Sequence, residues 1–187
     1  SELRARRRGI GVVAGRSTQS LALTMRSTPG IVVMATLFGA LPVVAATTPK
    51  FEEYPVKSER VAKPAEVRLD SHPKARTFRT VIRQGAKTGP NFAGHFTIVK
   101  WGCGTACVEI AIVDAVSGEV YFPRQLQPLA FQAITDDTPP LQYRLDSRLL
   151  VVAGSPEDRE GNEGIYAYVW EKRRLRAIHH AHKDWPR

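Results

Sequence analysis

Residues 95–113 read His95-Phe-Thr-Ile-Val-Lys-Trp-Gly-Cys-Gly-Thr-Ala-Cys-Val-Glu-Ile-Ala-Ile-Val113. This stretch holds two runs rich in β-branched and aromatic residues, 95–101 and 108–113, which is typical of strands. The second run is apolar almost throughout, as expected of a strand covered on both faces. The short glycine-rich connection favours an antiparallel pair. The stretch therefore predicts a β-hairpin, with a sheet at the centre of the fold.

The sequence after the hairpin contains further short strand patterns separated by turn residues. We expect these strands at 120–122, 141–145, 149–153, 165–170 and 175–178. With the two strands of the hairpin they make about seven, joined mostly by tight turns. An antiparallel sheet is predicted, either open or closed into a small barrel or sandwich.

A helical pattern precedes the hairpin. Phe78, Val81 and Ile82 share one face at helical spacing. Ser71 is a candidate N-cap, Pro73 falls in the first turn, and Gly85 is a candidate stop. The sequence thus predicts one helix over about 73–85, at the N-terminal side of an α+β domain that is mainly antiparallel β.

The N-terminal part of the chain has the composition of an export signal. Residues 25–46 combine Arg26, an apolar run over 31–41, and small residues ending at Ala46. We interpret 25–46 as a signal peptide, 1–24 as an upstream extension outside the functional protein, 47–70 as an extended lead-in and 71–187 as a single globular domain. The apolar run is shorter than the roughly 20 residues of a membrane span. We therefore expect a periplasmic or secreted protein that has no membrane segment after cleavage.

The charge of the chain is concentrated in the segment that we expect to be removed. The whole chain carries 27 Lys and Arg against 18 Asp and Glu, a net charge of +9. Residues 1–46 hold six Arg and one Glu, which leaves 21 positive and 17 negative residues and a net charge of +4. Nucleic-acid binding requires a concentrated basic face, so we do not expect a nucleic-acid partner.

The two cysteines of the chain, Cys103 and Cys107, lie close together in the hairpin, and His95 lies upstream. An oxidising compartment favours a disulfide between them, which we take as the leading interpretation. A zinc site with His95 as third ligand and a thiol site with His95 as base are the alternatives. We expect no metal and no cofactor under the leading interpretation.

Large aromatic side chains form a second candidate site. In an extended strand, Tyr166, Tyr168 and Trp170 lie on one side, and Trp101 stands beside the cysteine loop. Such amphipathic rings are frequent in protein interfaces, so these four residues are candidate binding residues. Packing of the same stripe in the core is the alternative interpretation.

Two motifs resemble a set of small, exported, uncharacterised bacterial proteins. They are Asn91-Phe-Ala-Gly-His95-Phe and Trp101-Gly-Cys-Gly-Thr-x-Cys107, and the likeness covers 90–122. The segments Asp146-Ser-Arg-Leu-Leu150 and Tyr168-x-Trp170 are similar too. The resemblance implies an envelope protein and supplies no catalytic residues.

These observations favour an exported, non-catalytic binding protein. Its expected partner is another envelope protein, by analogy of size and compartment with the inhibitors and immunity proteins of cell-wall hydrolases. The alternative is a hydrolase or redox enzyme of the envelope that uses His95 with Cys103 or Cys107.

Overall fold

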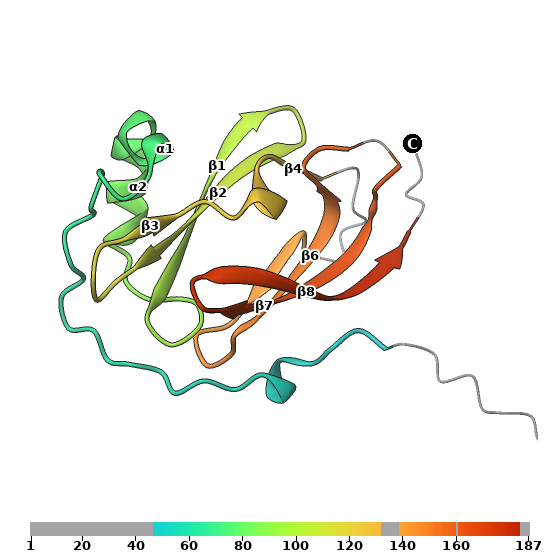
Figure 1. Cartoon of the computed structure of the whole chain (residues 1–187), viewed down its shortest axis with the longest axis horizontal. Coiled ribbons are helices and arrows are strands. Elements are labelled where there is room, and N and C mark those ends of the chain that lie inside the picture. Colours follow the sequence, from blue (N-terminus) through green and yellow to red (C-terminus); the bar gives the residue numbers. More distant parts are fainter. Residues whose placement is uncertain (1–46, 132–138, 160, 184–187) are drawn as a thin grey trace, which may run out of the picture. The chain divides into compact units, whose positions relative to one another are not determined.

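The predicted hairpin is present as strands β1 (Phe96–Gly104) and β2 (Cys107–Asp114), which pair antiparallel (Figure 1). The computed structural model describes residues 47–131, 139–159 and 161–183. These residues belong to one of two compact units of the chain, Val44–Arg187. The expected upstream extension (1–24) and signal peptide (25–46) lie outside the described residues.

The described strands form one open antiparallel sheet of eight members, in the order β1-β2-β4-β6-β7-β8. β3 pairs with β2 beside this path, and β5 pairs with β6. The mainly antiparallel fold predicted from the sequence is confirmed. The further strands are β3 (Val120–Tyr121), β4 (Leu129–Ala130), β5 (Leu141–Tyr143), β6 (Leu149–Pro156), β7 (Gly164–Glu171) and β8 (Arg174–His182).

The two-residue strand β4 connects the two halves of the sheet. Leu129 and Ala130 pair with β2 on one side and with β6 on the other. Because side chains of a strand alternate between faces, both halves send one set of apolar residues into a shared core. Its fully buried members include Phe92, Ile110, Ile112, Leu129, Leu150 and Val152.

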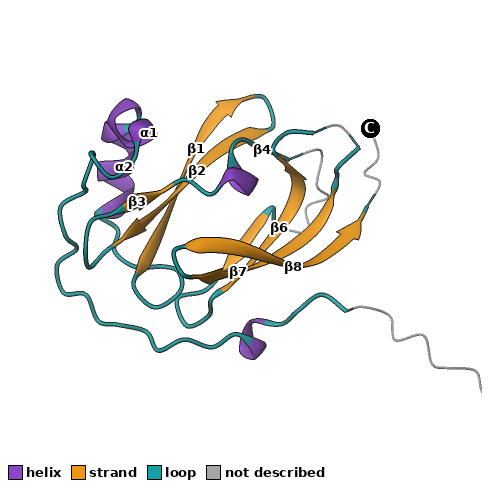
Figure 2. Cartoon of the chain, in the orientation of Figure 1, coloured by secondary structure: helices purple, strands orange, loops and turns teal. Residues whose placement is uncertain are grey.

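The opposite face of β1 and β2 is covered by helices. Instead of the one helix predicted over 73–85, the chain forms α1 (Pro73–Thr77) and α2 (Arg79–Ala86), which meet at Phe78 (Figure 2). Ile82 is fully buried against Val99 and Val113 of the sheet. Within the described residues, no helix has the length and apolar content needed to cross a membrane.

Two local predictions about the helical region were wrong. The N-cap is His72, whose Nδ1 accepts a hydrogen bond from the Lys74 N–H at 3.1 Å, and not Ser71. Gly85 lies inside α2 and does not stop it. A Cβ at Gly85 would collide with the side chain of Val99. This glycine is therefore explained by close packing of α2 on β1, which the sequence pattern does not reveal.

The lead-in follows the surface of the described domain in a mostly extended path, with one short 3-10 helix, η1 (Phe51–Glu53). Four of its backbone N–H groups donate hydrogen bonds to backbone carbonyl groups of the domain. The pairs, donor first, are Val56 with Asp146, Glu59 with Gly94, Ala65 with Ala115, and Arg68 with Gly118. Phe51 and Tyr54 pack on the outer face of β6 and β7. The lead-in is thus attached along its length.

Candidate functional site

The cysteine pair forms the predicted disulfide. Cys103 and Cys107 are bonded across the end of the β1–β2 hairpin, with their Cα atoms 5.2 Å apart. The intervening residues are exposed, and Phe131 N–H donates to Ala106 O at 2.7 Å. The bond closes a short loop, residues 102–107, which we call the disulfide loop. The paired strands β1 and β2 hold the loop at its two ends.

His95 is not part of that cluster. It precedes β1, whereas Cys103 lies near the other end of the same strand. A strand rises about 3.3 Å per residue, so roughly 25 Å separates the two positions. Both sulfurs are in the disulfide. The alternative thiol or zinc site, built from His95, Cys103 and Cys107, is not formed, because the sequence proximity of its members is lost along an extended strand.

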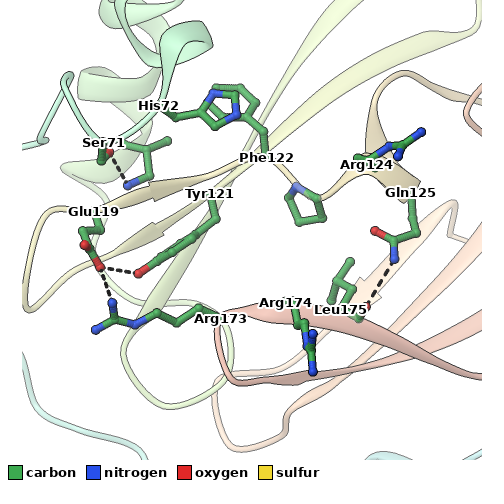
Figure 3. Close-up of a pocket in the computed structure, with 12 residues that line it drawn as sticks. Ser71, His72, Glu119, Tyr121, Phe122, Arg124, Gln125, Arg173, Arg174 and Leu175 are labelled. Carbon is green, nitrogen blue, oxygen red and sulfur yellow. Dashed lines mark hydrogen bonds and ion pairs between the residues drawn. The ribbon is translucent and has the colours of Figure 1, made fainter.

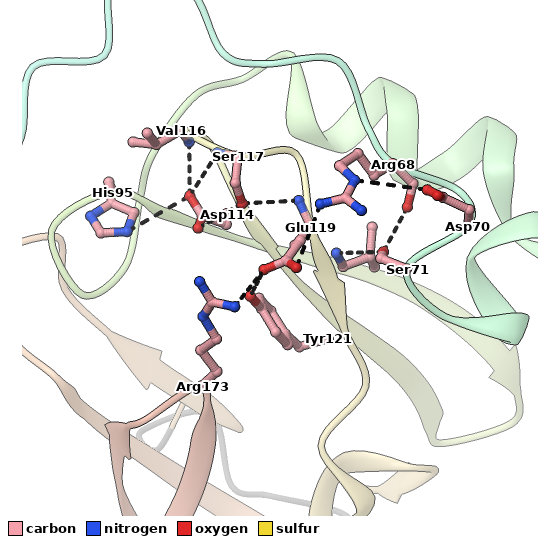
Figure 4. A network of polar contacts seen from close by, with 11 residues as sticks. Arg68, Asp70, Ser71, His95, Asp114, Val116, Ser117, Glu119, Tyr121 and Arg173 are labelled. Atoms are coloured by element: carbon pink, nitrogen blue, oxygen red, sulfur yellow. Dashed lines mark hydrogen bonds and ion pairs between the residues drawn. The ribbon is translucent and has the colours of Figure 1, made fainter.

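His95 instead joins three segments of the fold. Its Nδ1 lies 3.2 Å from Glu59 Oε1 of the lead-in, and its Nε2 lies 3.7 Å from Asp114 Oδ1 at the end of β2. The ring stacks on Phe96 with centroids 4.3 Å apart. Asp114 also accepts hydrogen bonds from the N–H groups of Val116 and Ser117 (Figure 4). This histidine attaches the lead-in to the sheet.

The rest of the motif around His95 is explained by the fold. The side-chain amide of Asn91 accepts from Ile98 N–H at 2.8 Å and donates to Ile98 O at 3.3 Å. It occupies the free edge of β1 as a neighbouring strand would. Gly94 has a φ of +89°, and a Cβ there would lie 2.9 Å from Lys57 O. Both residues therefore serve the architecture.

The aromatic stripe lies in the interior. Tyr166, Tyr168 and Trp170 are on one side of β7 as predicted, but their exposed fractions are 8%, 3% and 3%. Burial raises the pKa of the Tyr166 and Tyr168 hydroxyls above the ordinary range. The stripe therefore matches the core-packing interpretation, and in this conformation it offers a partner little surface.

Trp101 is half-buried on the helical face of β1. Its ring contacts Phe78 at a centroid distance of 4.8 Å and Phe122 at 6.3 Å. Its buried Nε1–H has no acceptor among the described residues. Trp101 thus supports the base of the disulfide loop by packing.

A cleft that the sequence did not predict opens between β3 and the start of β8. Its volume is about 440 Å³. Its apolar lining residues include Tyr121, Pro123 and Leu175, whereas the ring of Phe122 lies on the opposite side of the chain against His72, and arginines stand around the cleft (Figure 3). The lining comprises Ser71, His72, Glu119, Val120, Tyr121, Phe122, Pro123, Arg124, Gln125, Arg173, Arg174 and Leu175. These residues come from three segments that are far apart in the sequence, so no short sequence motif predicts the cleft.

Positive charge dominates the rim of this cleft. Glu119, its one carboxylate, accepts from the Tyr121 hydroxyl and pairs with Arg173 at 3.0 Å and with Arg68 at 3.6 Å. Burial, and then this hydrogen bond, raise the pKa of Tyr121. Arg124 and Arg174 are exposed and have no ion pair within the described part of the chain.

The β7–β8 turn, which leads into Arg174, has a strained backbone conformation. Lys172 and Arg173 both have positive φ, 49° and 61°, as the tight turns that suit hairpins require. Non-glycine residues pay roughly 1 kcal/mol or more each for this conformation. The dipeptide Asn-Gly would adopt this turn with less strain. Backbone strain of this kind is often found at functional positions.

Neither a family model, a curated protein nor a solved structure matches the chain. Among the described residues, no group of three or more His, Cys, Asp or Glu side chains is arranged to hold a metal ion.

Proposed function

We propose that the protein is an exported binding protein that recognises another protein of the cell envelope. The observation that carries the proposal is the disulfide loop, which is closed by Cys103–Cys107, exposed and held at both ends. A recognition element that is already ordered loses little conformational entropy on binding. Inhibitors and immunity proteins of cell-wall hydrolases, which have a similar size and compartment, are the analogy for such a partner.

The composition of the disulfide loop supports direct contact with a partner. Gly102 has no atom within 4 Å of a Cβ built on it, and its φ lies outside the left-handed region. Neither packing nor backbone conformation therefore requires glycine here, although glycine weakens a strand. Because Gly102 has no side chain, its backbone is accessible to a partner protein that approaches closely.

Export is the second part of the proposal. The disulfide is compatible with an oxidising compartment, and residues 25–46 have the composition of a signal peptide. The test is the intact mass of protein purified from the envelope. We expect a chain that starts near Thr47 and is about two mass units lighter than its reduced form. A chain retaining 25–46, or one with two free thiols, would contradict export.

Partner recognition is tested by steric substitution at the disulfide loop. Thr105→Trp adds bulk at the exposed turn, and Val116→Trp adds the same bulk at an exposed turn far from the loop. Each variant is used to capture proteins from an envelope extract, and captured proteins are identified and tested again in purified form. We expect Thr105→Trp to abolish the interaction and Val116→Trp to preserve it. Equal behaviour of the two variants would reject the loop as the recognition element.

A further inference from the structure

The cleft between β3 and β8 has strand edges on both sides. β8 is the last strand of the sheet order, and β3 pairs with β2 alone. Their outward backbone groups are covered by side chains: Val120 N–H donates to Ser71 Oγ at 3.0 Å, and Leu175 O accepts from Gln125 Nε2 at 3.2 Å. Unpaired edges with replaceable partners are where an added strand binds.

The positive charge of the cleft favours the binding of acidic groups. Arg173 is matched by Glu119, so Arg124 and Arg174 remain as two cations without a carboxylate partner in the described residues. Arginine binds carboxylates through paired, charge-assisted hydrogen bonds. Both residues line the cleft, and their side chains extend outward from it (Figure 3). Because these side chains are long and exposed, they can turn toward a ligand lying in the cleft.

The floor of the cleft suits apolar side chains. Tyr121, Pro123 and Leu175 are apolar members of its lining, and Tyr121 and Leu175 belong to the face of the sheet that carries the shared core. In an extended peptide, successive side chains point to opposite sides. A strand of alternating apolar and acidic residues would therefore place its apolar groups on this floor and its carboxylates toward the rim.

We propose that this cleft binds an extended acidic peptide segment as an added strand, with its carboxylates on Arg124 and Arg174. The main-chain groups of Val120 and Leu175 exchange their side-chain partners, Ser71 and Gln125, for the peptide backbone. The site is separate from the disulfide loop. It goes beyond the proposed function, and neither depends on the other.

The test uses purified protein and defined peptides at low ionic strength. One fluorescent peptide alternates valine with glutamate, and a second replaces each glutamate by glutamine. A third keeps the glutamates but carries N-methyl groups on alternate backbone nitrogens. Binding is followed by fluorescence anisotropy. We expect the glutamate peptide to bind about tenfold tighter or more than the glutamine peptide, and the N-methylated peptide to lose binding.

Matched variants assign the binding to the cleft. Arg124→Gln combined with Arg174→Gln should make the glutamate peptide bind no better than the glutamine peptide. Arg60→Gln combined with Arg76→Gln removes the same charge from exposed positions elsewhere and should leave binding nearly unchanged. Equal loss in both double variants would overturn the proposal, because it would reflect net charge alone. Equal binding of the N-methylated peptide would also overturn it, because backbone pairing would then be unnecessary.

Capture by the disulfide loop is read out separately. If Thr105→Trp abolishes capture of the envelope partner and no peptide binds the cleft, the proposed function stands and this inference fails. If the acidic peptide binds the cleft and Thr105→Trp changes nothing, the inference stands and the role of the loop fails.

Discussion

Glu119 and Arg173 form an ion pair in which Oε2 and Nη1 lie 3.0 Å apart. Glu119 immediately precedes β3, and Arg173 lies in the β7–β8 turn, so the pair connects two elements that are not neighbours in the sheet. The hydroxyl of Tyr121 donates to the same oxygen. This carboxylate therefore holds one end of the cleft together, and the electrostatic behaviour of the cleft depends on it.

The stability of the protein should fall at alkaline pH because of buried tyrosines. The pKa values of Tyr121 and Tyr168 are raised above the ordinary value of 10.0, mainly by burial. Below that value both are protonated in the folded and unfolded chain. Above it the unfolded chain loses these protons first, so the free energy of unfolding decreases as pH rises toward the folded-state values. Urea unfolding at about pH 9 and about pH 11 measures the decrease.

Two variants test the origin of that decrease. Tyr121→Phe removes one of the shifted groups, so the difference in unfolding free energy between the two pH values should shrink. Glu119→Gln removes the negative charge beside the hydroxyl, so the pKa of Tyr121 should fall, as followed by tyrosinate absorbance. An unchanged absorbance titration in Glu119→Gln would show that the carboxylate does not influence Tyr121.

The β7–β8 turn should be open to stabilisation. Lys172 has a φ of 49°, and asparagine tolerates this region better than lysine. Lys172→Asn should raise the free energy of unfolding by roughly 0.5 kcal/mol or more while leaving the Glu119–Arg173 pair intact. The control is Lys87→Asn, because Lys87 is exposed and has a negative φ of −64°. A gain in the control as large as that of Lys172→Asn would show that strain relief is not the cause.

The sequence predicted the elements better than their contacts. The alternation in 95–113 identified the central hairpin and its disulfide, because strand periodicity and cysteine spacing are local properties. The sequence did not show that His95 is carried away from the cysteines by β1. Nor did it show that the stripe of Tyr166, Tyr168 and Trp170 faces a core shared by both halves of the sheet. Burial depends on which strands fold over one another, and the two-residue strand β4 gives almost no signal.

Packing of α2 on β1 should make Gly85 intolerant of alanine. A helical glycine replaced by alanine normally gains up to about 1 kcal/mol, but here the new Cβ would overlap Val99. Gly85→Ala should therefore lower the free energy of unfolding by roughly 1–3 kcal/mol. In the double variant with Val99→Ala, the Gly85→Ala change should cost much less, which a double-mutant cycle by urea unfolding measures. Additive effects would exclude the close contact.

The disulfide should contribute modestly to global stability. The loop that it closes is very short, with a sequence separation of 4 between the cysteines, so it restricts the unfolded chain little. Replacing Cys103 and Cys107 by serine should lower the free energy of unfolding by roughly 2 kcal/mol or less. The larger expected effect is faster hydrogen exchange confined to the disulfide loop. A loss of cooperative unfolding in the serine variant would instead show that the bond is required for the fold.

The stability of the free edge of β1 should depend on the side-chain amide of Asn91. Its amide makes two hydrogen bonds to the backbone of Ile98, a buried residue of that edge. Asn91→Ala leaves both backbone groups without these bonds and should cost roughly 1–3 kcal/mol of unfolding free energy. Unpaired edges also promote association, so the variant should self-associate in sedimentation experiments. Gln142→Ala removes an amide hydrogen bond at an exposed site and should change stability by less than about 0.5 kcal/mol. A monomeric Asn91→Ala variant with unchanged stability would show that solvent satisfies this edge equally well.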